Sequence, residues 1–134
     1  WYTQGSWVLT GERHAWSPVA GGFGGVKVET PFNLKTGDIG AWEIAARYST
    51  LDLNFREGVR GLATPTGGVR GGEQEITTLG LNFYPNNVVR FLLDYQWVSV
   101  DRLNPTTLAA SGVPVGAQIG QDYDVVSLRT QVAF

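Results

Sequence analysis

The chain has 134 residues, a formal net charge of −2 at pH 7 and 18 glycines, and it contains neither cysteine nor methionine. This near balance of charge argues against a nucleic-acid partner. No apolar run approaches the roughly 20 residues of a membrane-spanning helix, so a membrane location would require strands. The first residues are Trp1 and Tyr2, without a signal sequence, and we expect the chain to be part of a longer mature protein.

Six segments alternate apolar and polar residues with the period of two that is typical of β-strands. The predicted strands cover residues 1–10, 26–34, 40–53, 74–84, 88–101 and 122–134. The segment at 26–34 has the weakest pattern, because Pro31 interrupts it and removes a hydrogen-bond donor. No segment has a helical pattern, so the sequence predicts an all-β fold.

The connections between these strands alternate between long and short. Residues 11–25, 54–73 and 102–121 are polar or Gly-rich loops, whereas 35–38 and 85–87 have the composition of tight turns. Outer-membrane barrels alternate in this way because their periplasmic turns are tight and their extracellular loops are long. We therefore expect both turns at the periplasmic end and the three loops at the extracellular end.

The last segment has one apolar face, formed by Val126, Leu128, Thr130, Val132 and Phe134. Such a strand, rising about 3.3 Å per residue with a tilt of about 45°, is long enough to cross the hydrocarbon core of a bilayer. Further aromatic residues gather near the predicted strand ends. They are Trp42, Phe83, Tyr84 and Phe134 on the predicted periplasmic side, and Trp7, Tyr48, Tyr95 and Trp97 toward the other. This distribution is typical of the aromatic girdles of membrane barrels.

Several blocks have the pattern of a known family. They are 40–49, 78–87 with the following Val89-Arg90-Phe91, and 121–134, with further matches at 8–12 and 23–27. These blocks resemble the C-terminal third of the phosphate-selective porins of the O and P family. Six strands cannot close a barrel, whose smallest known members have about eight, so the remaining strands would come from missing chain.

The resemblance implies a transmembrane antiparallel β-barrel of sixteen strands in the bacterial outer membrane, assembled as a homotrimer, of which this chain would form the last six strands. It also implies diffusion of phosphate, pyrophosphate or other small anions through a pore lined with Arg and Lys, whose constriction loop lies upstream. The implied partners are outer-membrane lipid, small anions and the barrel-assembly machinery, which would recognise the strand ending in Phe134. It implies no cofactor.

The chemical feature of the sequence is a row of charged residues on the predicted inward faces: Arg47, Arg90, Arg129, Glu43 and Asp94. A guanidinium group stays charged, and its planar fork suits phosphate oxygens. In a lumen, such cations attract anions and supply successive weak sites that allow passage. The alternative is that the two carboxylates neutralise the arginines, which would then only stabilise the wall.

The sequence predicts neither catalysis nor a metal site. His14 is the only histidine and follows Glu12 and Arg13 in a predicted loop, where we expect a solvated side chain. The pairs Glu73/Glu75 and Asp122/Asp124 lack the number of ligands that Ca²⁺ requires, and residues 69–72 form a predicted loop with no helix to bind phosphate.

Two other functions remain open. One is a non-selective or structural outer-membrane barrel, and the other is a soluble β-barrel or sandwich that binds a small ligand. A soluble protein would stay monodisperse without detergent, which separates the last possibility from the others.

Overall fold

The computed structural model describes residues 1–19, 21–105 and 112–133. Within these ranges the regular structure consists of strands, turns and isolated bridges, without a helix. Accordingly, these residues include no helical segment of the length and hydrophobicity that a membrane crossing requires. The predicted all-β, antiparallel fold is confirmed.

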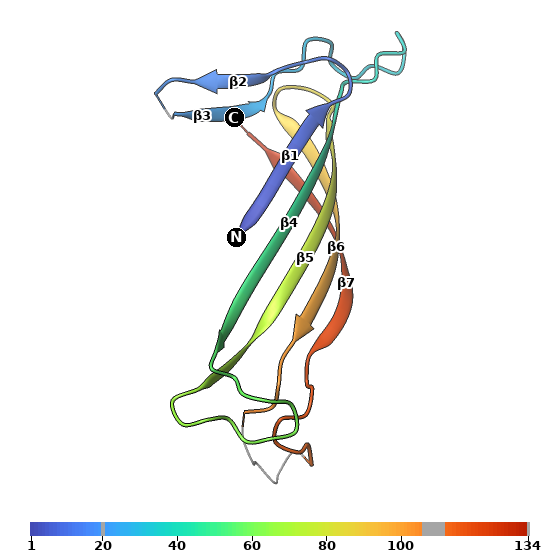
Figure 1. The fold of residues 1–134 in the computed structure, drawn as a ribbon. Coiled ribbons are helices and arrows are strands. Elements are labelled where there is room, and N and C mark those ends of the chain that lie inside the picture. Colours follow the sequence, from blue (N-terminus) through green and yellow to red (C-terminus); the bar gives the residue numbers. More distant parts are fainter. Residues whose placement is uncertain (20, 106–111, 134) are drawn as a thin grey trace. The chain divides into compact units, whose positions relative to one another are not determined.

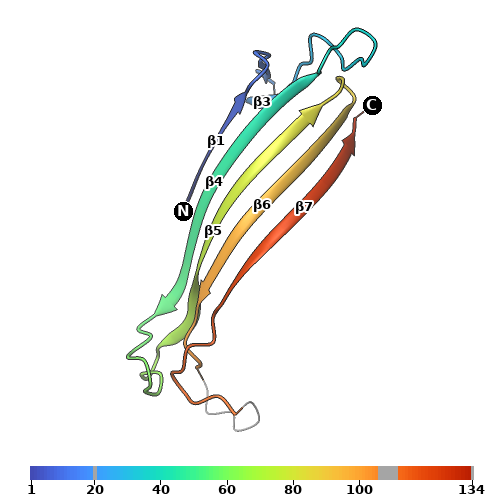
Figure 2. The same ribbon diagram turned by 90° about the vertical axis from the view of Figure 1, so that its right-hand side faces the viewer.

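Five strands form one sheet in the order β1-β4-β5-β6-β7 (Figures 1 and 2). Their bounds are Tyr2–Val8 for β1, Ala41–Phe55 for β4, Val69–Tyr84 for β5, Val89–Asp101 for β6 and Gln121–Val132 for β7. The two remaining strands, β2 (His14–Ser17) and β3 (Gly22–Val26), pair only with each other in an antiparallel hairpin. β1 and β7 are the edges of the described sheet, which is not closed.

The chain divides into two compact units. The loop unit consists of Trp1–Thr3, Tyr48–Thr77 and Trp97–Asp124, and the turn unit consists of Gln4–Arg47, Thr78–Gln96 and Val125–Phe134. The loop unit contains the connections 56–68 and 102–120, whereas the turn unit contains the connections 9–40 and 85–88.

β1 pairs directly with β4. The amide of Leu9 donates to the carbonyl of Trp42 at 2.7 Å, and the amide of Thr50 donates to the carbonyl of Trp1 at 2.9 Å. The prediction of a strand at 26–34 is therefore wrong, because β1 and β4 are neighbours in the sheet with no strand between them. Residues 27–40 contain only a turn bridged between Asn33 and Asp38. The five other predicted strands overlap β1, β4, β5, β6 and β7, although β5 begins earlier than predicted, at Val69.

The direct pairing of β1 with β4 also changes the position of the first connection. Residues 9–40 meet the β5–β6 turn: the amide of Phe32 donates to the carbonyl of Pro85 at 2.8 Å, and the amide of Val28 donates to Asn87 Oδ1 at 2.7 Å. The expectation that residues 11–25 lie at the opposite end from the tight turns is therefore wrong. In the turn unit, a long connection and a tight turn lie together.

A small apolar cluster explains why residues 26–34 had a strand-like pattern. Val26 and Val28 are buried, with 6% and 3% of their surface exposed, among Val8, Ala41 and Tyr84. Their alternation reflects packing of this connection on the sheet rather than pairing within it. Apolar spacing does not distinguish these two kinds of burial.

The strands of the turn unit have two unlike faces. On the outer face, large apolar side chains are exposed: Trp7, Ile44, Leu79, Leu81, Phe91, Leu93, Val126 and Leu128. On the inner face, polar and charged residues alternate with small ones, and the connection 9–40 covers part of it through Val26 and Val28. This division follows from the period of two along β4, β5, β6 and β7, and it locates the candidate site on the inner face.

Candidate functional site

The inner face of the turn unit contains a concavity of about 780 Å³. Four of the five charged residues predicted to face inward line it: Glu43 and Arg47 from β4, Asp94 from β6 and Arg129 from β7. The other lining residues are Gln4, Gly5 and Ser6 from β1, His14, Phe23 and Gly24 from the hairpin, Ala45 and Ala46 from β4, and Thr78 and Gly80 from β5. Residues distant in sequence thus meet at one site because neighbouring strands turn alternate side chains, including these charged ones, toward the same face.

Gly80 provides part of the space in this concavity. A Cβ atom at position 80 would lie only 2.9 Å from Asp94 Oδ1 and 3.5 Å from the Cβ of Ala45. Because glycine has no side chain, the carboxylate of Asp94 can lie against the backbone of the neighbouring strand. A larger residue at position 80 would both displace this carboxylate and reduce the volume.

Arg90, the fifth predicted residue, lies in a separate pocket of about 340 Å³ with Tyr84, Asn86 and Gln131 among its lining residues. Its Nε donates to Gln131 Oε1 at 2.9 Å, and its Nη2 donates to the same oxygen. Arg90 therefore shares the inner face with Arg47 and Arg129 but does not line the same concavity.

Glu43 is the centre of a hydrogen-bond network, with only 3% of its surface exposed. Its Oε2 accepts hydrogen bonds from the hydroxyl of Tyr84 at 2.7 Å and from the amide of Asn82 at 3.0 Å. Its Oε1 lies 2.8 Å from His14 Nε2 and completes an ion pair with that side chain. A buried carboxylate needs such partners, because moving an unpaired charge from water into the protein interior costs on the order of several kcal/mol.

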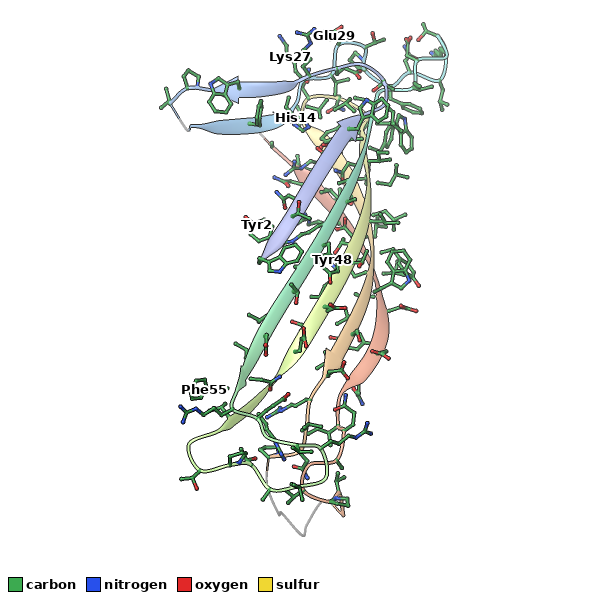
Figure 3. The ribbon with its side chains drawn as sticks, in the orientation of Figure 1. Tyr2, His14, Lys27, Glu29, Tyr48 and Phe55 are labelled. Atoms are coloured by element: carbon green, nitrogen blue, oxygen red, sulfur yellow. The ribbon has the colours of Figure 1, made fainter. Side chains whose placement is uncertain are left out.

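His14 connects the hairpin to this network (Figure 3). Its Nδ1 lies 3.0 Å from the carbonyl oxygen of Gly24, while its Nε2 faces Glu43. Both partners are hydrogen-bond acceptors, so only the doubly protonated ring can donate to both at once. The Gly24 carbonyl is the main cause that raises the pKa of His14 above its usual 6.5; partial burial opposes this shift, and Glu43 adds to it.

The prediction that His14 is a solvated loop residue is therefore wrong. His14 begins β2, and its side chain is 30% exposed and bonded on both sides. Its partner Glu43 is 29 residues away in sequence, and no local motif links the two. The sequence pattern suggests the inward-facing arginines as counter-ions of Glu43, whereas the structure pairs Glu43 with His14.

The loop unit contains a second buried charge, Arg70, of which 2% is exposed. Its guanidinium donates to four carbonyl oxygens: Glu57 at 2.8 Å, Val59 at 3.3 Å, Leu62 at 2.8 Å and Asn104 at 3.0 Å. These carbonyls belong to both connections of the loop unit. Residues 69–72, predicted as a loop, are the first residues of β5, and this strand fixes the position of the guanidinium.

The paired carboxylates also belong to strands of the loop unit. Glu75 accepts a hydrogen bond from the Tyr48 hydroxyl at 2.8 Å, and Asp122 accepts one from Ser99 Oγ at 2.6 Å. Across residues 1–19, 21–105 and 112–133, no group of three or more His, Asp or Glu side chains is arranged to hold a metal ion. The hydrogen bonds indicate that Glu75 and Asp122 stabilise pairs of neighbouring strands.

Comparison with known families identifies the chain. The family model for phosphate-selective porin O and P matches residues 1–134, which is the whole chain. The chain belongs to this porin family. No curated protein and no solved structure matches it. The family consists of phosphate-transporting β-barrel channels rather than enzymes, and outer-membrane location and trimeric assembly are in keeping with it.

Family membership accounts for the aromatic residues on the outer face of the turn unit. Phe83 packs against Trp42, Phe32 and Phe91, with ring centroids 4.5, 5.7 and 6.2 Å apart. Trp42 Nε1 donates to the carbonyl of Ile39 at 3.0 Å, so its polar atom is bonded while its ring stays on the outer face. Aromatic residues with this combination are enriched where a membrane barrel meets the headgroups.

Some residues of the predicted girdles lie elsewhere. Tyr84 is buried on the inner face, where it donates to Glu43. Trp7 belongs to the turn unit, in a shallow depression that it shares with Ile44 and Leu79, rather than among the residues of the loop unit. Phe134 lies outside the described residues, and its role remains a prediction.

Proposed function

We propose that the chain forms the C-terminal part of the wall of a sixteen-stranded, trimeric outer-membrane pore, through which small anions such as phosphate or pyrophosphate diffuse. In this proposal the inner face lines the pore and Arg47, Arg90 and Arg129 attract the anions. The outer face contacts lipid, and the missing strands come from chain that precedes this segment. The barrel-assembly machinery recognises β7 together with Phe134.

The observation that carries the proposal is the concavity that contains both Arg47 and Arg129. Glu43 has His14 as its counter-ion, so its negative charge is balanced within the hairpin–sheet contact. Among the described residues of the concavity, the two guanidinium groups then face one further carboxylate, Asp94. The local excess of positive charge favours anions, and exposed guanidinium groups hold phosphate weakly enough for it to leave.

Replacement of Arg47, Arg90 and Arg129 with Gln in the full-length porin tests this function. The triple variant keeps hydrogen-bonding capacity and similar length but loses three positive charges. We expect the reversal potential of single channels in a salt gradient to shift toward cation preference. The shift should be clearest near 0.01 M salt, where the screening length is about 30 Å, and it should shrink at high salt.

A matched control replaces Lys27, Lys35 and Arg60 with Gln. These residues are exposed, do not line the concavity and carry the same total charge. A shift of equal size in the control would attribute the effect to net charge rather than to the inner face. An unchanged reversal potential in the arginine variant, with conductance intact, would instead support a non-selective or structural barrel.

The soluble alternative has a separate test. A soluble β-barrel that binds a small ligand would remain monodisperse after removal of detergent. The exposed apolar side chains of the outer face, which include Leu93, Val126 and Leu128, favour aggregation under these conditions.

A further inference from the structure

The β2–β3 hairpin forms one side of the inner-face concavity. His14, Phe23 and Gly24 line it from the hairpin, opposite Arg47 and Arg129 from the sheet. The position of the hairpin therefore sets how wide this part of the inner face is open. Trp16 and Phe23, whose rings lie 4.9 Å apart, hold the two strands of the hairpin together.

The hairpin is attached to the sheet in two unlike ways. At its base, Val26 and Val28 are buried in the apolar cluster, and Val28 exchanges two hydrogen bonds with the side chain of Asn87, at 2.7 and 3.2 Å. The titratable group of this attachment is the Tyr84 phenol, which stays protonated near neutral pH, so the attachment does not depend on pH in that range. Nearer the concavity, His14 bonds to Glu43. This second attachment depends on pH, because the His14 ring can donate to both Glu43 and Gly24 only when each ring nitrogen carries a proton.

We propose that His14 is a positioning residue of the pore: its charged form holds the hairpin across the inner-face concavity, and loss of its proton weakens this hold while the base stays anchored. A neutral imidazole has one N–H, whereas both the Gly24 carbonyl and the Glu43 carboxylate require a donor. Deprotonation therefore breaks either the bond to Glu43 or the bond to Gly24 within the hairpin, and in both cases it removes the ion pair that ties the hairpin to β4. This inference rests on the proposed function only in that the concavity belongs to the pore.

Further charged groups line the same concavities as His14. Glu43 faces it from β4, with Tyr84 of β5 bonded to the same carboxylate. Arg47 of β4, Asp94 of β6 and Arg129 of β7 share the concavity with it, and Glu12 and Arg13 precede it in the hairpin connection. Positive groups near an imidazolium oppose its protonated form, and carboxylates favour it. The Gly24 carbonyl and the Glu43 carboxylate, one at each ring nitrogen, favour the charged form of His14.

Distance measurements on the full-length porin in lipid vesicles test this latch. Because residues 1–134 contain no cysteine, spin labels can be attached in this segment to Val19→Cys, an exposed residue of the turn between β2 and β3, and to Thr78→Cys on β5. We expect a narrow distribution of distances at low pH. The distribution should broaden toward longer distances as the pH rises through the pKa of His14.

Two variants identify the titrating group. H14Q retains a donor but cannot titrate, so its distance distribution should not change over the same pH range. E43Q keeps the Gly24 contact but removes the favourable charge, so its transition should move to lower pH by about one unit. A transition that persists in H14Q, or a wild-type distribution that does not change with pH, would overturn the latch.

Channel recordings supply the functional readout. At about 1 M salt, where the screening length is about 3 Å, the charge of His14 has little effect on the current. Under these conditions the wild type should show more frequent changes of conductance level as the pH rises, and H14Q should show no such dependence. Equal pH dependence in both proteins would contradict the proposed control of pore width. The spin-label result does not depend on anion preference, so failure of the latch and failure of the pore assignment can be distinguished.

Discussion

Among the residues that the structure describes, each unit buries one charged side chain, and the two charges are satisfied in different ways. Glu43 in the turn unit accepts its hydrogen bonds from side chains, whereas Arg70 in the loop unit donates to four backbone carbonyls. Both tie a connection to a strand of the sheet. The partners of Glu43 include a histidine, whose charge depends on pH near neutrality, while a guanidinium and a carbonyl do not titrate in this range.

This difference indicates that the contacts between connection and strand depend on pH in the turn unit but not in the loop unit. Residues 57–62 and Asn104, from the two connections of the loop unit, are bonded to the Arg70 guanidinium, which stays charged near neutral pH. The hairpin in the connection 9–40 is fixed partly by an ion pair that deprotonation removes. In a porin, such a contrast allows one connection to respond to conditions while others keep their shape.

The largest effect should follow from Arg70→Ala. The change removes the guanidinium group that donates to the carbonyls of Glu57 and Leu62, and it leaves a cavity at a site with 2% exposure. We expect the free energy of unfolding, measured by denaturant titration from lipid vesicles, to fall by about 3 kcal/mol. Arg60→Ala, on an exposed residue of the same connection, should change it by less than about 0.5 kcal/mol. Similar losses in both variants would mean that the carbonyl contacts do not stabilise the loop unit.

A smaller loss is expected for Glu43→Gln. The amide group of Gln has one acceptor oxygen in place of two, so its NH₂ group faces a donor from His14 or from the pair Asn82 and Tyr84. The free energy of unfolding should fall by about 2 kcal/mol, because one or two buried donors lose their acceptor. Asp94→Asn provides the control, since Asp94 is more exposed and lies in the same concavity. A greater loss for Asp94→Asn than for Glu43→Gln would contradict the central role of Glu43.

The faces of the sheet could be predicted from the sequence because strand periodicity is local. Alternation along β4, β6 and β7 is enough to put Arg47, Asp94 and Arg129 on one face, and the structure brings these three into one concavity. The apolar outer face follows from the same pattern. Each of these results requires only the period of two and the direction of the neighbouring strands.

The hairpin and both buried charges could not be predicted, since they depend on contacts distant in sequence. Val26 and Val28 have the spacing of a strand, but they pack on the sheet instead of pairing in it. Arg70 is bound by carbonyl oxygens, which every residue possesses, so no sequence motif marks its site. His14 and Glu43 meet only because the connection 9–40 folds over the inner face. The residues next to each of them in the sequence form no motif that predicts this contact.

The smallest expected effect concerns the pH dependence of stability, which most directly sharpens the contrast between the units. The pKa of His14 is raised in the folded protein above its usual 6.5. Its contribution is therefore fully present below the pKa of the unfolded chain and is lost as the pH rises through the folded pKa. Because the side chain is partly exposed, we expect at most about 1 kcal/mol. The free energy of unfolding of the wild type minus that of H14Q should decline over this range, whereas the difference between the wild type and Arg70→Ala should stay constant. A difference between wild type and H14Q that grows with pH would have the wrong sign and would contradict the charged state of His14.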